Sequence, residues 1–278
     1  TAKEDFAGLQ TEVANYPDEK RALVFLSLPR TYQSWEFIER QGVYFHNYYW
    51  KNVHFWRLQA WDAQAKFILE QHLKFQRFAD AVTLVSSILE SIDSKEPLVL
   101  EVTEAFARNI TAEDLKNFWR QHIDYDLGKV VAYLEINFVD QRERVAQLEF
   151  QLLPLLEKSG RGLNALFSAI SESPDMFAQL INNAFRSRNQ QDRELDENDR
   201  ALANVSYNLL DKWREIPGYK NGILDEWKLR SWLVETRRLL AGRKDKKIYG
   251  FQGTCCGAGG GNGLWFNGMA RHVGREIK

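Results

Sequence analysis

Apolar residues recur at helical spacing in the stretch from Trp61 to Ile92. They form two groups separated by a short polar connection: Trp61, Ala65, Ile68, Leu69 and Leu73, and then Phe78, Ala81, Val82, Val85, Ile88, Leu89 and Ile92. Each group lines one face of a helix with a period of about 3.6 residues. A connection of about four residues makes two such helices antiparallel. The pattern therefore predicts a helical hairpin of the kind that stacks into solenoids, in which each hairpin covers the next one.

The residues before this hairpin predict a series of shorter helices. Residues 3–15 form a weakly amphipathic pattern that Pro17 ends. Periodicity leaves open whether the apolar segment 22–29 is a buried strand or a helical turn, and the lack of a partner strand favours the helical turn. Thr31 is a candidate N-cap for the following helix, which ends at Gly42.

The residues after Pro97 predict further helices with recognisable starts. The candidate starts are the Thr111–Asp114 capping-box pair, the N-cap Asp126, the Asp140–Glu143 pair, and Ser173 followed by Pro174 at the first helical position. Pro154 is expected to kink or shorten the helix that contains it. The expected fold class is therefore all-α: stacked antiparallel helix hairpins in an α-solenoid-like arrangement.

A polar stretch divides the chain. Residues 187–200 hold only one large apolar residue, Leu195, so they cannot contribute to a core and are expected to form a charged connector. We therefore expect a helical-repeat domain at 1–186 and a C-terminal part at 201–278. That part begins with a second helical hairpin around the turn PGYKNG, and the second helix of this hairpin ends at Gly242. Nine of the 17 glycines then lie from Gly250 to Gly274, which predicts a glycine-rich loop before a terminal helix.

Composition and charge exclude several functions. Lysine and arginine number 37 against 38 acidic residues, so the chain as a whole is not attracted to nucleic acid or anionic lipid. No apolar run approaches the ~20 residues of a membrane span. The charged start of the sequence is unlike a signal peptide, and two adjacent cysteines, Cys255 and Cys256, cannot build a disulfide framework. We expect a cytoplasmic protein without membrane contact.

Motifs for catalysis, cofactors and metals are incomplete. The glycines from Gly257 to Gly263 follow no strand and lack the Lys–Ser/Thr pair of a phosphate-binding loop. The adjacent cysteines lack the two-residue gap that is typical of a zinc site. The five histidines form no His-Glu-x-x-His pattern, and Glu135, Glu143 and Glu149 on neighbouring helices lack the histidine partners of a di-metal bundle. The sequence therefore predicts neither an enzyme nor a bound metal or cofactor.

A densely aromatic segment precedes the central hairpin. Seven aromatic residues stand close together there: Tyr44, Phe45, Tyr48, Tyr49, Trp50, Phe55 and Trp56. Internal packing is one interpretation, but one short segment cannot bury all seven side chains on one face. We hypothesise that some of them form a protein-binding surface: Tyr44, Tyr48, Tyr49, Trp50 and Trp56. Replacing Tyr48, Tyr49 and Trp50 with alanine is then expected to weaken partner capture without unfolding the chain.

Basic residues gather where the second C-terminal helix ends. They are Arg237, Arg238, Arg243, Lys244, Lys246 and Lys247. Cations at a helix C-terminus complement the helix dipole, so a purely structural role explains them. The alternative is contact with the phosphate backbone of a nucleic acid.

Several phrases of the sequence resemble successive blocks of a helical-repeat region found in large bacterial multidomain proteins. These phrases are YYWKNV, LEFQLLPLLE, SPDMFAQLINNAFR, WREIPG, NGILDEWKLRSWLVETRRL and NGLWFNGMARHV, and they cover most of the chain from Tyr48 onward. The region is associated with ATP-binding and defence-type proteins of unassigned biochemistry. The resemblance carries helix starts, turns and packing aromatics but no catalytic residue, and it departs from the pattern in the extra glycines of the last block. It implies that the chain is a segment of a longer protein.

The sequence as a whole thus predicts a non-catalytic protein-binding, sensor or scaffold region of a larger bacterial protein. Stacked helix pairs present a wide and rigid concave surface, which suits recognition of a protein or peptide. Nucleic-acid binding through the basic helix end is the alternative function.

Overall fold

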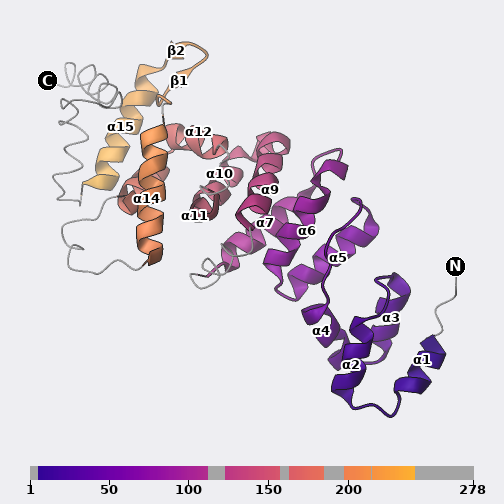
Figure 1. Ribbon diagram of the computed structural model, residues 1–278. Helices are drawn as coiled ribbons and strands as arrows, with labels where there is room; N and C mark the ends of the chain where they lie inside the picture. Colours follow the sequence, from indigo (N-terminus) through magenta and orange to yellow (C-terminus); the bar gives the residue numbers. More distant parts are fainter. Residues whose placement is uncertain (1–5, 112–122, 157–162, 185–196, 214, 242–278) are drawn as a thin grey trace. The chain divides into compact units, whose positions relative to one another are not determined.

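The computed structural model describes residues 6–111, 123–156, 163–184, 197–213 and 215–241 (Figure 1). These residues are mostly helical, and the strands among them are two short ones, which confirms the all-α class. The contacts divide the chain into two compact units. We call the described residues up to 133 the N-terminal unit and those from 134 onward the C-terminal unit. Within the described ranges, every helix is too short or too polar to cross a membrane.

The N-terminal unit is a succession of short helices. In chain order they are α1 (Phe6–Val13), α2 (Asp18–Leu26), α3 (Tyr32–Arg40), α4 (Val43–Asn52), α5 (Ala63–Lys74), α6 (Phe78–Ile88), the 3₁₀ turn η1 (Leu89–Ser91), α7 (Pro97–Asn109) and the first part of α9 (Ile123–Asn137). Helix α4 packs against both α2 and α3. The core of this unit therefore forms where the apolar faces of successive helices meet.

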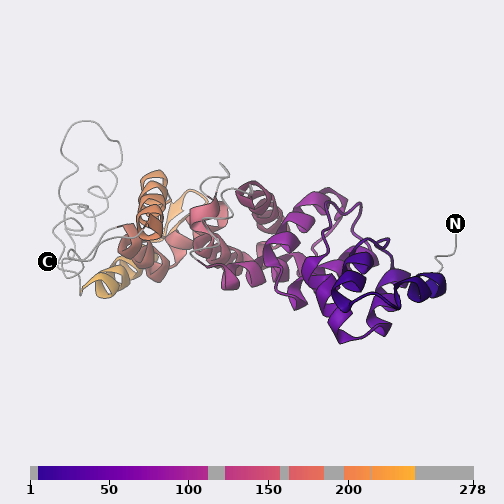
Figure 2. The same ribbon diagram turned by 60° about the horizontal axis from the view of Figure 1, so that its bottom comes forward.

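Helices α5 and α6 form the predicted hairpin. They pack against each other, and α6 also packs against α7, so the three lie side by side in both views (Figures 1 and 2). Asp62 caps α5 by accepting a hydrogen bond from the backbone amide of Ala65 at 2.8 Å. The chain then reverses through Gln76, whose φ is 59°. Most of the apolar residues that predicted the hairpin face are buried, among them Ala65, Ile68, Leu69, Ala81, Val82 and Val85, and the others are partly buried.

The segment that periodicity left open, 22–29, is helical over most of its length because α2 runs to Leu26. Thr31 caps α3 as predicted, and its side chain accepts a hydrogen bond from the amide of Ser34 at 3.3 Å. Gly42 follows α3 with a φ of 113°, a backbone conformation that side chains disfavour. The start and the end of α3 were therefore readable from the sequence.

The C-terminal unit continues with helices and adds one small β-hairpin. Its elements are the end of α9, the 3₁₀ turn η2 (Val139–Gln141), α10 (Arg142–Gln151), α11 (Leu153–Leu156), α12 (Asn164–Glu172), α13 (Pro174–Ala184), α14 (Glu197–Lys212), β1 (Tyr219–Lys220), β2 (Ile223–Leu224) and α15 (Glu226–Leu240). Helix α10 ends just before Pro154, which confirms the predicted interruption. Helix α12 packs against α10 and α13.

Helices α14 and α15 pack mainly against α13, not against each other as the sequence suggested. Aromatic rings explain this arrangement, because Phe177 of α13 contacts both Trp213 and Trp232, with centroid distances of 5.5 and 4.9 Å. The two indoles are also in contact, at 6.1 Å. A domain boundary at 187–200 is therefore wrong, since the helices on both sides of it share one core. The contacts place the division within α9 instead.

Asp126 does not cap a helix, contrary to the prediction. It lies inside α9, where its carboxylate accepts a hydrogen bond from the Ser86 hydroxyl at 2.8 Å. The helix already includes Ile123, whose buried side chain extends the apolar stripe upstream of Asp126. The prediction thus placed the start of the helix at an acidic residue that lies in its first turn.

Asp140 is not the N-cap of α10, contrary to the prediction, because it lies inside the 3₁₀ turn η2. The 3₁₀ turn η2 runs directly into α10, so the N-cap position falls on Gln141, whose side chain makes no capping hydrogen bond. By contrast, the start of α13 is confirmed, because the Ser173 hydroxyl accepts a hydrogen bond from the amide of Met176 at 3.3 Å. Pro174 begins that helix, where its missing amide proton costs nothing.

The turn PGYKNG is a two-stranded antiparallel β-hairpin in which Tyr219 pairs with Leu224 and Lys220 with Ile223. Asn221 and Gly222 form its tip with φ values of 52° and 83°. Two consecutive residues with positive φ match the right-handed twist of the strands, and Asn-Gly adopts this turn readily. The sequence analysis predicted the turn at PGYKNG but not the two strands that flank its Asn-Gly pair.

Several expected features lie outside the described residues. They are the helix opened by Asp114, most of the charged connector 187–200, the helix end at Gly242, the glycine-rich loop at 250–274 and the terminal helix.

Candidate functional site

The proposed aromatic surface in α4 is partly core. Tyr49 and Trp50 are only 1% and 2% exposed, so the expectation that they meet a partner is wrong for both. Their burial follows from the packing of α4 on α3, because the Trp35 indole donates a hydrogen bond to the Tyr49 hydroxyl at 3.1 Å and its ring lies 5.5 Å from that of Trp50. Alanine at either position would therefore open a cavity in the core.

The other members of that proposed surface remain accessible. Tyr44 and Tyr48 lie one helical turn apart on α4, with ring centroids 6.2 Å apart, and Tyr48 is half-buried. Trp56 lies in the segment after α4 and is 90% exposed.

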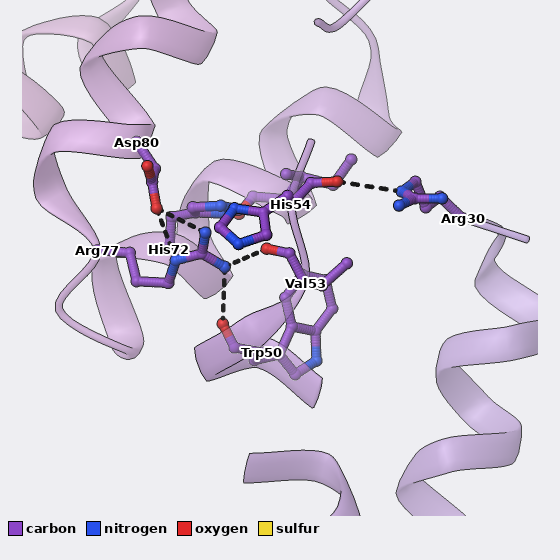
Figure 3. Close-up of polar contacts among 8 residues, drawn as sticks. Arg30, Trp50, Val53, His54, His72, Arg77 and Asp80 are labelled. Carbon is purple, nitrogen blue, oxygen red and sulfur yellow. Dashed lines mark hydrogen bonds and ion pairs between the residues drawn. The ribbon is translucent and has the colours of Figure 1, made fainter. Parts of the chain in front are cut away.

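Arg77 fastens the central hairpin to α4 (Figure 3). Its guanidinium donates hydrogen bonds to the carbonyl oxygens of Trp50, at 3.2 Å, and Val53, and it pairs with Asp80 through Nε at 2.7 Å. His72 lies beside this group, and burial lowers its pKa to about 4. The Arg77 guanidinium therefore bonds to α4 and to Asp80, with the neutral His72 ring beside it. These bonds anchor the central hairpin to α4.

The neutral histidine has a simple explanation. Its Nδ1 donates a hydrogen bond to the carbonyl of Ile68 at 2.8 Å, and its ring lies 5.6 Å from that of Phe55. The Nε2 atom is buried without a partner. Because a buried imidazolium would leave that nitrogen charged and unsatisfied, the fold keeps His72 neutral.

A cleft of about 810 Å³ opens in the C-terminal unit between α12, the β-hairpin and α15. We call it the hairpin cleft. Two aromatic side chains at its edge are exposed, Trp227 of α15 at 76% and Tyr219 of β1 at 51%. The indole of Trp232 lines the cleft as well but is buried. Exposed rings beside a hollow are typical of a binding site, because they gain most when a ligand covers them.

Hydrogen bonds hold the floor of the hairpin cleft in place. The Trp232 indole donates to the carbonyl of Ile170 at 3.1 Å. The Trp213 indole donates to the Ser171 hydroxyl at 3.2 Å, and that hydroxyl donates to the Glu215 carboxylate at 3.0 Å. These hydrogen bonds connect α12 to α15 and to the segment that follows α14. The cleft therefore has its shape before a ligand binds.

Gly218 sets the position of the β-hairpin at the edge of the cleft. Its φ is 78°, and a Cβ atom on it would lie 2.7 Å from the carbonyl oxygen of Asp225. The amide of Asp225 donates to the Gly218 carbonyl at 2.9 Å, while its carboxylate caps α15 by accepting from the amide of Lys228 at 3.0 Å. Only glycine allows the hairpin base to approach the start of α15 this closely.

Charged side chains of both signs line the hairpin cleft. Three cations there form no ion pair within the described residues: Arg142, Lys220 and Lys228. Glu235 is already paired with Arg238, with 2.5 Å between Oε1 and Nη2, and this guanidinium lowers the pKa of Glu235. The cleft therefore has positively charged side chains that lack an ion-pair partner among the described residues.

A second cavity of about 460 Å³ lies between α10 and α13 and shares Arg142 and Glu172 with the hairpin cleft. We call it the polar cavity. Its lining includes three amide side chains, Gln147, Gln151 and Gln179. Amides both donate and accept hydrogen bonds, so they suit a ligand with peptide groups.

The basic helix end is only partly described. Arg237 and Arg238 lie exposed in the last turn of α15, and Arg238 is engaged with Glu235. The other four residues of this group, Arg243, Lys244, Lys246 and Lys247, lie outside the described residues. The described part of this group is therefore limited to two adjacent arginines, one of which pairs with Glu235.

Two carboxyl groups meet at the N-terminus of α12. Glu135 accepts hydrogen bonds from the amides of Asn164 and Ala165 at 2.7 and 3.2 Å, and Glu149 accepts one from the amide of Leu166 at 2.7 Å. Burial raises the pKa of Glu149 to about 9, and the neighbouring Glu135 acts in the same direction. Glu149 is therefore protonated at neutral pH and serves as an uncharged cap.

Among the described residues, no three His, Cys, Asp or Glu side chains are grouped to hold a metal ion. The described residues that line the hairpin cleft carry hydroxyl, carboxylate, ammonium, guanidinium and aromatic groups. Sequence reasoning missed this cleft, because its residues come from segments far apart in the chain.

Comparison with known proteins adds no identification: no family model, no curated protein and no solved structure matches this chain.

Proposed function

We propose that this chain is a non-catalytic binding module that captures an extended peptide segment of a partner protein in the hairpin cleft. One observation carries the proposal: a preformed hollow of about 810 Å³ has exposed aromatic side chains, Trp227 and Tyr219, at its edge. Trp and Tyr are the residues that contribute most strongly to protein recognition when a partner covers them.

The rigidity of the cleft supports capture of a flexible ligand. Since Trp232, Ser171 and Glu215 are held by hydrogen bonds from neighbouring helices, the site loses little conformational entropy on binding. The ordering cost then falls on the peptide alone.

The wider architecture belongs to the same proposal. We propose that the helix pairs continue a solenoid-like stack, within a larger bacterial protein of the helical-repeat type that the sequence resembles. Such an arm would serve in the cytoplasm as a sensor or scaffold that displays the cleft.

Replacing Trp227 with alanine tests the function. We expect the full chain to bind members of an immobilised library of short peptides, and the W227A variant to bind the same peptides at least about tenfold more weakly, as for an aromatic hot spot. The control is Y125A, because Tyr125 is an exposed aromatic residue of the N-terminal unit that belongs to neither proposed binding surface. Equal binding by wild type and W227A would contradict the proposal.

Nucleic-acid binding through the basic helix end is the second proposal, and it has less support. It relies on Arg237 and Arg238, of which Arg238 is already paired. It predicts an affinity for single- or double-stranded DNA that falls steeply with salt, by a logarithmic slope of about −0.9 for each phosphate contacted. Binding that is absent or insensitive to salt would exclude it.

A further inference from the structure

The hairpin cleft and the polar cavity lie next to each other, because Arg142 and Glu172 line both hollows. A ligand that extends past these two residues would reach from one hollow into the other, and we call the two together the groove. Each hollow alone falls within the roughly 300–1,000 Å³ of a small-molecule site, and the two together exceed it. An extended chain therefore fits the groove better than a compact molecule does.

The two ends of the groove differ in charge. At the hairpin end, Lys220 of β1 and Lys228 of α15 stand beside the aromatic edge and form no ion pair within the described residues. Lys228 adjoins Gly218, since a Cβ atom there would lie 3.2 Å from that of the lysine. The Glu215 carboxylate also lines this end, but it accepts hydrogen bonds from the Ser168 and Ser171 hydroxyls, at 3.4 and 3.0 Å, and Glu235 is paired with Arg238. A ligand carboxylate placed beside Lys220 and Lys228 would therefore meet ammonium groups without an ion-pair partner among the described residues.

The end between α10 and α13 is acidic. Glu143 begins α10, Asp175 begins α13, and Glu172 ends α12, all lining the polar cavity. Arg142 is the one cation among the residues that line this cavity, and its guanidinium donates to the Ser168 hydroxyl at 2.7 Å. Glu143 and Glu172 form no ion pair within the described residues, so this end favours a basic side chain.

We infer that the ligand is a bipolar peptide, with an acidic side chain at the hairpin end of the groove, an apolar side chain against Trp227, and a basic side chain over the polar cavity. The inference rests on the proposed function and adds to it the chemical class of the ligand and its direction in the groove. Opposite charges at the two ends make a reversed or uniformly charged peptide a poorer fit.

A set of matched peptides tests the inference. The probes are end-blocked, fluorescently labelled peptides with one apolar centre, carrying glutamate at one end and lysine at the other, in both chain directions. Their partners replace the glutamates, the lysines or both with glutamine. Fluorescence anisotropy with the full chain should rank one bipolar direction first, with each neutralised end costing roughly threefold to fivefold in affinity.

Paired variants locate each charge. K220Q with K228Q should weaken the glutamate-bearing peptides by the same roughly threefold to fivefold factor and leave the glutamine counterparts unchanged. E143Q with E172Q should do the same for the lysine-bearing peptides. The matched control is K51Q with K74Q, two exposed lysines of the N-terminal unit, which should change neither. Thermal unfolding of each variant verifies that it is folded.

The outcomes separate the inference from the proposed function. If no peptide binds, or if W227A binds all of them like the wild type, the proposed function fails. If Trp227 matters but charged and neutral peptides bind alike, the function stands and the bipolar ligand is wrong. The bipolar ligand would also be wrong if the control variant lost affinity for the charged peptides while the groove variants kept it.

Discussion

Two buried ionisable residues show how the fold decides protonation. Glu149 keeps its proton because its carboxyl is fully buried next to Glu135, and its pKa is raised to about 9. His72 loses its proton because burial disfavours the charged imidazolium, and its pKa is lowered to about 4. Neither shift could be read from the sequence, since both depend on which groups surround the side chain.

Replacing Glu149 with glutamine should stabilise the C-terminal unit at alkaline pH. The folded protein holds more protons than the unfolded chain between the ordinary glutamate pKa and about 9, so wild-type stability falls as pH rises through this window. Glutamine reproduces the neutral cap and cannot ionise. We expect E149Q to exceed the wild type by on the order of 2 kcal/mol near pH 8, measured by urea unfolding.

The control for this prediction is E143Q on the same helix, where the side chain is exposed. This variant should keep the pH dependence of the wild type. An E149Q protein whose stability falls with pH as steeply as that of the wild type would show that Glu149 is already ionised in the fold.

At the scale of elements, two glycines of the β-hairpin do different work. Gly218 and Gly222 both have positive φ, but a Cβ atom on Gly222 meets nothing within 4 Å, whereas one on Gly218 would collide with the backbone of Asp225. The first glycine thus joins the hairpin to α15, and the second only forms the turn. The sequence marks both residues equally, and only their surroundings distinguish them.

Alanine at these two positions should separate the effects. G222A should cost about 1 kcal/mol of unfolding free energy, the penalty for a side chain in the left-handed region. G218A should cost roughly 1–3 kcal/mol more, because the hairpin must also move away from α15. Urea unfolding monitored by tryptophan fluorescence measures both. Equal costs for the two variants would contradict the expected clash between residue 218 and the backbone of Asp225.

At the scale of the whole molecule, the two units carry opposite dependences on pH. His72 lies in the N-terminal unit and Glu149 in the C-terminal unit. The unfolded chain binds more protons than the fold between about 4 and the ordinary histidine pKa, so the His72 contribution is lost as pH falls through that window. The Glu149 contribution is lost as pH rises, as described above.

Hydrogen exchange resolved along the chain should therefore show two different pH profiles. Protection of α5 and α6, corrected for the intrinsic exchange rate, should fall below about pH 6, while that of α10 and α12 should fall toward alkaline pH. Phenylalanine at position 72 keeps a planar ring but cannot titrate. The H72F variant should therefore lose the fall in protection at acidic pH in the N-terminal unit, and the C-terminal unit should be unchanged. A common profile in both units would contradict the assignment of these two residues.

The sequence by itself determined the all-α class, the central hairpin and the local helix starts at Thr31 and Ser173. These features depend on residues close together in the chain, through apolar periodicity and side-chain capping. Around Asp126 and Asp140 the boundaries differ from the predicted ones, because α9 already includes Ile123 and the 3₁₀ turn η2 precedes α10.

Only the tertiary structure decided which surfaces exist. It buried Tyr49 and Trp50 against Trp35, and it joined the helices on both sides of the charged connector through Phe177. The hairpin cleft likewise assembles residues from α10, α12, the β-hairpin and α15. Such groupings depend on how helix faces pack over long sequence separations, and the period of an apolar stripe specifies that a face is buried but not which partner buries it.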